Sequence, residues 1–140
     1  MAVLLKDLSK EKKPRKKSAD LEHKLQTGCV NWYRSQFRNK LLFSIPNGGQ
    51  RSKTTGKKLK AEGVTAGVPD LFLAVGNHNY HGLFIEMKYG NNICSEIQSD
   101  IHIILKQSRY KVEVCYTLDS FMQIICDYLG VPNINSNKKR

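Results

Sequence analysis

Two carboxylates and a lysine lie within one expected β-hairpin. Asp70 opens the apolar run DLFLAV, and Glu86 and Lys88 lie in a second apolar run, GLFIEMKY. The polar, glycine-bounded segment between the runs predicts a hairpin turn. Because paired antiparallel strands run in opposite directions, the start of the first strand lies beside the end of the second. The pattern therefore brings two acids and an ammonium group to the open end of the hairpin.

Strand alternation predicts what surrounds these three groups. Successive side chains point to opposite faces of a strand. Asp70 then shares a face with Phe72, and Glu86 and Lys88 share a face with Phe84. The other face carries apolar residues throughout: Leu71, Leu73, Val75, Leu83, Ile85, Met87 and Tyr89. One face is expected to be buried, and the other to hold the charges above an aromatic floor.

The charged group allows two interpretations. Two close carboxylates repel each other, so one stays protonated unless a cation separates them, and Mg²⁺ commonly binds a few carboxylates together with water. At such a site water can attack a phosphodiester, while Lys88 orients or deprotonates the water or neutralises charge on the phosphate. The alternative is an ordinary cross-strand ion pair of Lys88 with Asp70 or Glu86. Spacing alone leaves both open.

Length and charge narrow the class of protein. The chain has 140 residues, enough for one domain with one core, and 23 Lys and Arg against 12 Asp and Glu give a net charge of +11. This surplus favours a polyanionic partner, with nucleic acid ahead of a membrane surface or of charge that only aids solubility. Basic clusters lie at 6–17 and 51–60.

Cysteine spacing and hydropathy point to an intracellular protein. No two of the four cysteines are spaced as CxxC, so we expect free thiols in a reducing compartment. No apolar run approaches the roughly 18 residues of a membrane span, and the opening MAVLLK is too short for a signal-peptide core. No membrane partner is expected.

Apolar periodicity predicts a mixed four-stranded α/β sheet flanked by helices, in the order αβββαβ with an additional short helix and a last helix. Ser18 is expected to cap the first helix, and Ser95 with Gln98 fits a capping box. The expected helices cover 19–39, a later part of 47–63, 95–107 and 119–129, and the remaining strands 41–46 and 110–116. The expected buried face of the third helix is Ile97, Ile101, Ile104 and Leu105.

The domain organisation follows from this pattern. Residues 1–17 are expected to form a basic, disordered arm, 18–130 a single domain, and 131–140 a basic tail.

Several motifs in order resemble one nuclease family. Pro69-Asp70 followed by Glu86-x-Lys88 resembles the PD-(D/E)xK nuclease signature, and the chain is more narrowly similar to VRR-NUC (virus-type replication-repair nuclease) domains. The other shared elements are an acid in the first helix (Glu22), Pro-Asn-Gly-Gly-x-Arg (46–51), Gly-Val (63–64), Gly-Val (67–68) and the Ser-x-x-Gln helix start (95–98).

The resemblance implies a metal-dependent DNA endonuclease with a restriction-endonuclease-like core, in which water attacks the phosphate in line. Asp70, Glu86 and Lys88 would be catalytic. The metal ligands would be Glu22, Asp70, Glu86 and the backbone carbonyl of Met87, holding one or two Mg²⁺ ions, with Mn²⁺ as a substitute. Gln98 would line the site. Expected DNA contacts are Asn47, Arg51, Lys53, Lys57 and Lys58, because Lys and Arg dominate phosphate binding.

The substrate expectation also comes from the resemblance. Small stand-alone members, of bacterial and phage type, resemble Holliday junction resolvases that act as homodimers. We therefore expect branched DNA, a homodimer and the cytoplasm of a bacterial or phage-infected host. The alternatives are the same chemistry on flaps or on nicked or duplex DNA, and a basic DNA-binding module without catalysis.

The histidines are assigned no catalytic function. His78 and His81 in NHNYH suggest an HNH nuclease, but they occupy the turn, at the far end of the hairpin from Asp70, and we interpret them as a solvated loop. His23 and His102 lie on expected helices without a partner pattern.

Overall fold

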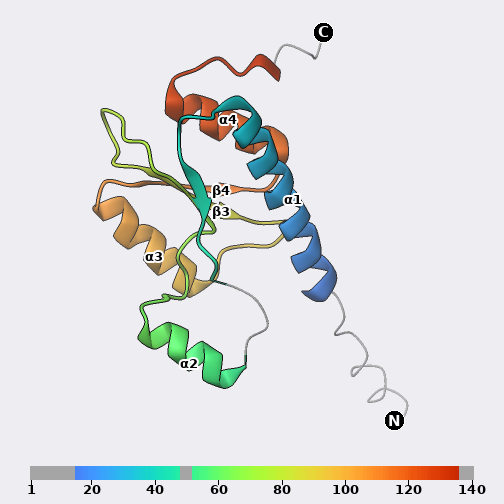
Figure 1. Cartoon of the computed structure of the whole chain (residues 1–140), viewed down its shortest axis with the longest axis vertical. Helices are drawn as coiled ribbons and strands as arrows, with labels where there is room; N and C mark the ends of the chain where they lie inside the picture. Colours follow the sequence, from blue (N-terminus) through green and yellow to red (C-terminus); the bar gives the residue numbers. More distant parts are fainter. Residues whose placement is uncertain (1–14, 48–51, 136–140) are drawn as a thin grey trace, which may run out of the picture.

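A computed structural model describes residues 15–47 and 52–135. Within these ranges the chain forms helices and strands in the order expected from the sequence (Figure 1). The helices are α1 (Arg15–Gln36), α2 (Lys53–Ala61), α3 (Glu96–Gln107) and α4 (Leu118–Leu129). The strands are β1 (Leu42–Ser44), β2 (Leu71–Leu73), β3 (Leu83–Met87) and β4 (Lys111–Cys115).

The strands form one mixed sheet in the order β1-β2-β3-β4. β1 pairs antiparallel with β2, and β2 pairs antiparallel with β3. β4 pairs parallel with β3, which is the arrangement expected when a helix such as α3 connects the two strands. The predicted mixed four-stranded α/β fold is confirmed.

One face of the sheet packs against α1 and α4 and forms the core. Leu71, Leu73, Leu83 and Ile85 have no exposed surface, as alternation predicts for this face. They cluster with side chains from the two helices: Cys29, Tyr33, Phe121, Ile125 and Tyr128. Figure 1 shows α1 and α4 packed side by side, away from α3.

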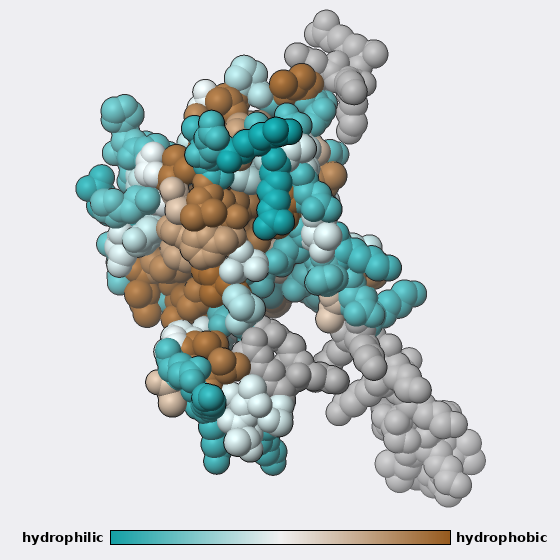
Figure 2. Space-filling model, viewed as in Figure 1, coloured by the Kyte–Doolittle hydropathy of each residue, from teal (hydrophilic) through white to brown (hydrophobic). Residues whose placement is uncertain are grey.

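The opposite face is only partly covered. α3 lies over β3 and β4, while Phe43 on β1 and Phe72 on β2 remain partly exposed. Phe72 stacks on Phe84 at 4.4 Å between ring centroids, and Phe43 packs edge-on against Phe72 at 5.6 Å. In Figure 2 hydrophobic surface gathers over the strands in this view.

The expected buried face of α3 is wrong in part. Ile97 and Ile104 are 57% and 56% exposed, whereas Ile101 and Leu105 are half-buried. The side of α3 that contacts the sheet instead carries Gln98 and the buried His102. The apolar stripe of α3 therefore does not face the sheet directly, and the edge of the stripe that carries Ile97 and Ile104 is exposed to solvent.

The helix ends follow local chemistry, with one departure from expectation. Ser95 and Gln98 form the predicted capping box of α3, and Thr117 and Ser120 form another on α4. α1 begins at Arg15, so Ser18 is not its cap. The Ser18 hydroxyl instead accepts a 2.8 Å hydrogen bond from the Asn92 side chain. The segment 1–14, which makes up most of the expected arm, lies outside the described residues.

All four cysteines are free, as expected, and three of them are buried. In the described part of the chain, no helix has the length and apolar character needed to cross a membrane.

Candidate active site

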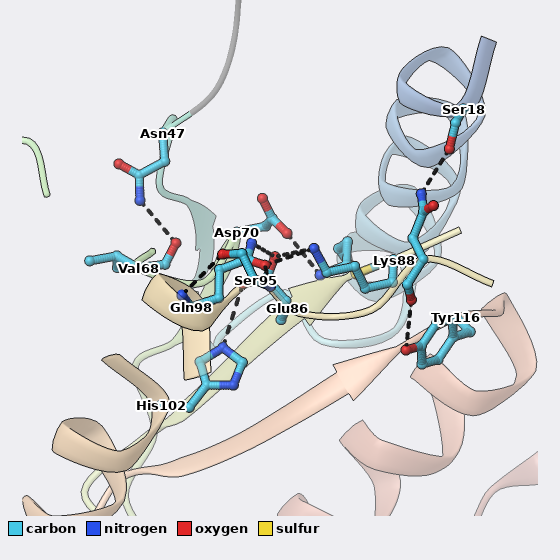
Figure 3. Close-up of polar contacts among 12 residues, drawn as sticks. Ser18, Asn47, Val68, Asp70, Glu86, Lys88, Ser95, Gln98, His102 and Tyr116 are labelled. Atoms are coloured by element: carbon cyan, nitrogen blue, oxygen red, sulfur yellow. Dashed lines mark hydrogen bonds and ion pairs between the residues drawn. The ribbon is translucent and has the colours of Figure 1, made fainter. Parts of the chain in front are cut away.

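Strand register brings the two predicted carboxylates together. Leu71 on β2 pairs with Ile85 on β3, so Asp70 lies opposite Glu86 at the open end of the hairpin. The Asp70 Oδ2 atom accepts a 2.8 Å hydrogen bond from the backbone N–H of Met87. The chain thus fixes one oxygen of Asp70 against β3, beside the Glu86-x-Lys88 segment (Figure 3).

The loop before Asp70 is held on both sides. The Asn47 side chain donates a 2.9 Å hydrogen bond to the carbonyl of Val68, and Pro69 is fully buried. Gly67 has φ +86°, and a Cβ added there would lie 2.8 Å from Ile97 on α3. Only glycine allows both this conformation and this close approach. The loop therefore sets the distance between Asp70 and α3.

Glu86 is the most deeply buried charged group of the site, with 2% exposure. Its Oε1 accepts a 2.8 Å hydrogen bond from Gln98 and lies 3.6 Å from the Lys88 ammonium. Burial raises the pKa of Glu86 to about 8, repulsion from Asp70 adds to this, and Lys88 acts in the opposite direction. A hydrogen bond with the Asp70 carboxyl and the charge of Glu22 raise this pKa further.

Gln98 connects the helix cap to the charged group. Its Oε1 accepts 2.9 Å hydrogen bonds from Lys88 Nζ and from the backbone N–H of Ser95, while its Nε2 donates to Glu86. The capping box that starts α3 therefore also orients a residue of the site. Lys88 keeps only 11% of its side chain exposed, so its ammonium group is held in place by Gln98 and Glu86.

Glu22 faces the site from α1. It is half-buried, and burial raises the pKa of its carboxyl, followed by the charge of Asp70, while Lys88 lowers it. As the side chains stand, no three His, Cys, Asp or Glu groups within the described ranges are gathered closely enough to hold a metal ion. Glu22 as a further ligand, like the Met87 carbonyl, stays a prediction.

Four of the five expected DNA contacts, Asn47 and three lysines of α2, lie within the described residues. Lys53, Lys57 and Lys58 are exposed on α2, a helix with no buried residue. The Asn47 amide contacts Val68, as described above. Arg51 lies outside the described residues. A role for any of these side chains in DNA binding stays a prediction.

The histidine loop is remote from the acids, in agreement with its interpretation as solvated. His78 and His81 are exposed in the connection between β2 and β3. That connection is ordered by Asn77, whose Oδ1 accepts hydrogen bonds from the backbone of Asn79 and Tyr80.

His102 is an addition that the sequence did not indicate. It is 8% exposed, and its Nε2 lies 3.6 Å from Glu86 Oε2 (Figure 3). The available signal was its spacing of four residues from Gln98, which places both side chains on one face of α3.

A comparison of the whole sequence with protein families identifies the family of this chain. The sequence model of the VRR-NUC domain family matches residues 9–118. The chain belongs to the VRR-NUC family. A solved structure named "VRR_NUC domain protein" is similar, with 26% sequence identity and a TM-score of 0.64, covering 79% of this chain and 88% of that one. A comparison with curated proteins finds no match.

Family membership sets the general chemistry. A VRR-NUC domain is a nuclease domain of the PD-(D/E)xK type, with DNA as substrate. Nucleases of this family generally use divalent metal ions.

Proposed function

We propose that this VRR-NUC protein is a Mg²⁺-dependent endonuclease that cuts branched DNA, of the four-way junction type, as a homodimer. The observation that carries the proposal is the Asp70–Glu86 pair. Burial raises the pKa of Glu86 to about 8, and repulsion from Asp70 adds to this against the charge of Lys88, so the pair favours an added positive charge.

The donor set fits a hard divalent cation. Asp70 uses Oδ2 for the Met87 amide, and Glu86 Oε2 is a buried oxygen with no hydrogen-bond partner among the described residues. A carboxylate oxygen has two lone pairs, so Oε2 can bind a cation and still accept one hydrogen bond. Oxygen atoms of this kind are the ligands that Mg²⁺ takes, and Mn²⁺ has similar preferences. We assign Asp70, Glu86, Glu22 and the Met87 carbonyl as ligands of one or two ions. Such an ion, when bound, supplies positive charge that activates water and polarises the phosphate.

Lys88 supplies a fixed positive charge beside the carboxylates. Gln98 holds its ammonium beside Glu86, so one of its remaining protons can face a phosphate oxygen or a water molecule. A positive charge fixed there stabilises the negative charge that grows on the phosphate as water attacks. Gln98 lines the site by holding Lys88 and Glu86 in place together.

The positive charge of the chain supports a DNA-binding surface outside the catalytic cluster. The chain carries a net charge of +11, and the exposed lysines of α2 offer a phosphate-binding surface. We assign Lys53, Lys57 and Lys58 to phosphate contacts, with Arg51 and Asn47 on the preceding segment. These contacts position the backbone and read no base sequence, as expected for an enzyme that selects DNA shape.

The homodimer is supported by an uncovered apolar surface. This surface has two parts. Phe43 and Phe72 lie on β1 and β2, and Ile97 and Ile104 lie along one edge of α3. The two parts adjoin because Ile97 lies next to Gly67, in the segment that leads into β2. A second copy suits this surface, because a two-fold dimer would place two sites on the two strands of a symmetric junction.

A cleavage panel tests the proposal. Labelled four-way junction, flap, nicked and plain duplex DNA are incubated with Mg²⁺ or with EDTA, and the cuts are mapped to the nucleotide. We expect paired cuts in the junction with Mg²⁺ and none in EDTA. Lys88→Ala should lose this activity, whereas Lys111→Ala, at a half-exposed lysine paired with Glu113, should keep it.

Each other result has a defined meaning. Preferential cutting of flaps or nicked DNA would keep the chemistry and replace the substrate. Cleavage by Lys88→Ala at the wild-type rate would overturn the proposed mechanism. Mg²⁺-independent DNA binding without any cleavage would favour a non-catalytic module.

A further inference from the structure

Both oxygens of the Glu86 carboxylate face α3. Gln98 donates a 2.8 Å hydrogen bond to Oε1, and His102, one turn later on the same helix face, directs Nε2 toward Oε2 at 3.6 Å. Both Glu86 and His102 are at least nine-tenths buried. One helix therefore approaches the carboxylate with two polar side chains, one for each oxygen.

The contact to Oε2 is incomplete. Glu86 Oε2 and His102 Nε2 are the two buried side-chain polar atoms without a hydrogen-bond partner in the part of the chain that the structure describes. Such atoms are uncommon in folded proteins because leaving them unpaired is costly. The two lie only about half an ångström beyond hydrogen-bond distance of each other. A small movement of Glu86 toward His102 would satisfy both atoms at once.

We propose that His102 is a positioning residue whose Nε2–H donates to Glu86 Oε2 and, together with Gln98, fixes the carboxylate in the orientation that binds the divalent cation. This inference rests on the proposed function of the site. A carboxylate that binds a metal is commonly held by hydrogen bonds from residues behind it, and these bonds restrict its rotation.

The position of His102 suits a donor to Glu86. An imidazole with its proton on Nε2 presents one N–H to Oε2, as the Gln98 amide presents one to Oε1. An apolar side chain would fill the same space beneath α3 but would leave Oε2 unpaired.

Metal affinity tests this inference separately from cleavage. Mn²⁺ binding is measured by calorimetry, without DNA, for the wild type, His102→Leu and His102→Gln. His102→Leu removes the donor, and His102→Gln keeps an amide N–H on a side chain of similar reach. His78→Leu, at an exposed loop position, is the matched control.

We expect His102→Leu to bind Mn²⁺ about 10- to 100-fold more weakly, the usual effect of losing a partner behind a metal ligand. His102→Gln should remain within a few-fold of the wild type, and His78→Leu should equal it. Thermal unfolding in EDTA checks that each variant is folded.

Three other results of the Mn²⁺ titrations would overturn the inference. Wild-type affinity in His102→Leu, or an equal loss in His102→Gln, would overturn the positioning role and leave the proposed nuclease intact. No Mn²⁺ binding by the folded wild type would overturn the metal site and this inference with it.

The tautomer of His102 gives a second readout. A long-range ¹H–¹⁵N spectrum of the protein saturated with Mg²⁺, in which Glu86 is ionised, should show the proton on Nε2. A proton on Nδ1 would place a lone pair against Glu86 and would overturn the inference.

Discussion

On the sheet face beneath α1 and α4, Leu71, Leu83 and Ile85 are wholly buried among apolar neighbours. On the other face, Phe72 and Phe84 are partly exposed, and the strand end beside them carries Asp70, Glu86 and Lys88. The same two strands, β2 and β3, thus supply a closed core on one side and a polar site with an open apolar floor on the other. Strand alternation lets the sequence build the two surfaces independently, so a substitution on one need not disturb the other.

The largest expected effect is a loss of cleavage, from a substitution in the polar site. Asp70→Asn keeps an oxygen to accept the Met87 N–H and removes the negative charge. Loss of a metal ligand's charge costs several kcal/mol of transition-state stabilisation, so we expect cleavage to fall by about 10³-fold. The free energy of unfolding should change by less than about 1 kcal/mol in EDTA. Single-turnover cleavage and urea unfolding measure the two quantities. A comparable loss of stability would show that the two faces are not independent.

On the face that forms the closed core, we expect a substitution to lower stability. Ile85→Ala should lower the free energy of unfolding by about 2 to 5 kcal/mol, because it removes fully buried atoms from a packed core. Val112→Ala, at a half-buried position on the other face of the neighbouring strand, is the control and should cost about 1 kcal/mol or less. Urea unfolding followed by Trp32 fluorescence measures both. Equal losses would contradict the difference in packing between the faces.

The sequence predicts the two sides of the strands better than it predicts how α3 covers the sheet. Alternation along β2 and β3 correctly placed Leu71, Ile85 and Asp70, because a strand has only two sides. Periodicity misplaced Ile97 and Ile104, because a helical apolar stripe does not say how much sheet lies beneath it.

The site shows the same limit. The motif Ser-x-x-Gln, which is local in sequence, predicts Gln98 in the capping box, and the place of Gln98 beside the site was expected from the family resemblance. His102 was not, because its partner Glu86 lies on a strand before the helix and only tertiary packing joins them. The preference of serine for helix starts predicts Ser18 as the cap of α1, but the helix begins three residues earlier, among lysine and arginine, which are good helix formers.

A third prediction uses pH to separate the polar face from the core. In the metal-free protein the pKa of Glu86 is about 8, above its ordinary value of 4.5, so the folded state keeps a proton that the unfolded chain has lost. The stability associated with this proton is complete below the ordinary pKa and is lost as the pH rises toward 8. We expect the free energy of unfolding in EDTA to fall by at least about 1 kcal/mol between pH 5 and pH 8 from this group.

Glu86→Gln is the matched comparison for the pH series, since it removes this titration and keeps the shape. His102 acts in the opposite sense, because its pKa is lowered and its contribution to stability rises with pH through its ordinary value. Subtracting the Glu86→Gln profile from the wild-type profile removes that background. Parallel profiles would show that Glu86 is already ionised without a cation, which would weaken the argument for a metal there.

The smallest expected effect concerns the uncovered part of the polar face. Ile104 and Ile103 are neighbours on α3 and are 56% and 54% exposed. The helical turn directs Ile104 to the edge shared with Ile97 and Ile103 to the outer side, away from the sheet. If a second copy covers the apolar surface over β1 and β2, Ile104→Glu should raise the dimer dissociation constant about tenfold or more, because it places a charge in the contact. Ile103→Glu should leave it unchanged, as measured by sedimentation.

Cleavage would then link this contact to the chemistry. The Ile104→Glu monomer keeps Asp70, Glu86 and Lys88, so it should still nick a junction, but its two cuts should become uncoupled in time. Equal weakening by both variants would place the contact on the outer side of α3 instead. A monomeric wild type that cuts both strands would remove the reason for the apolar surface proposed here, and the open face would then need a different partner.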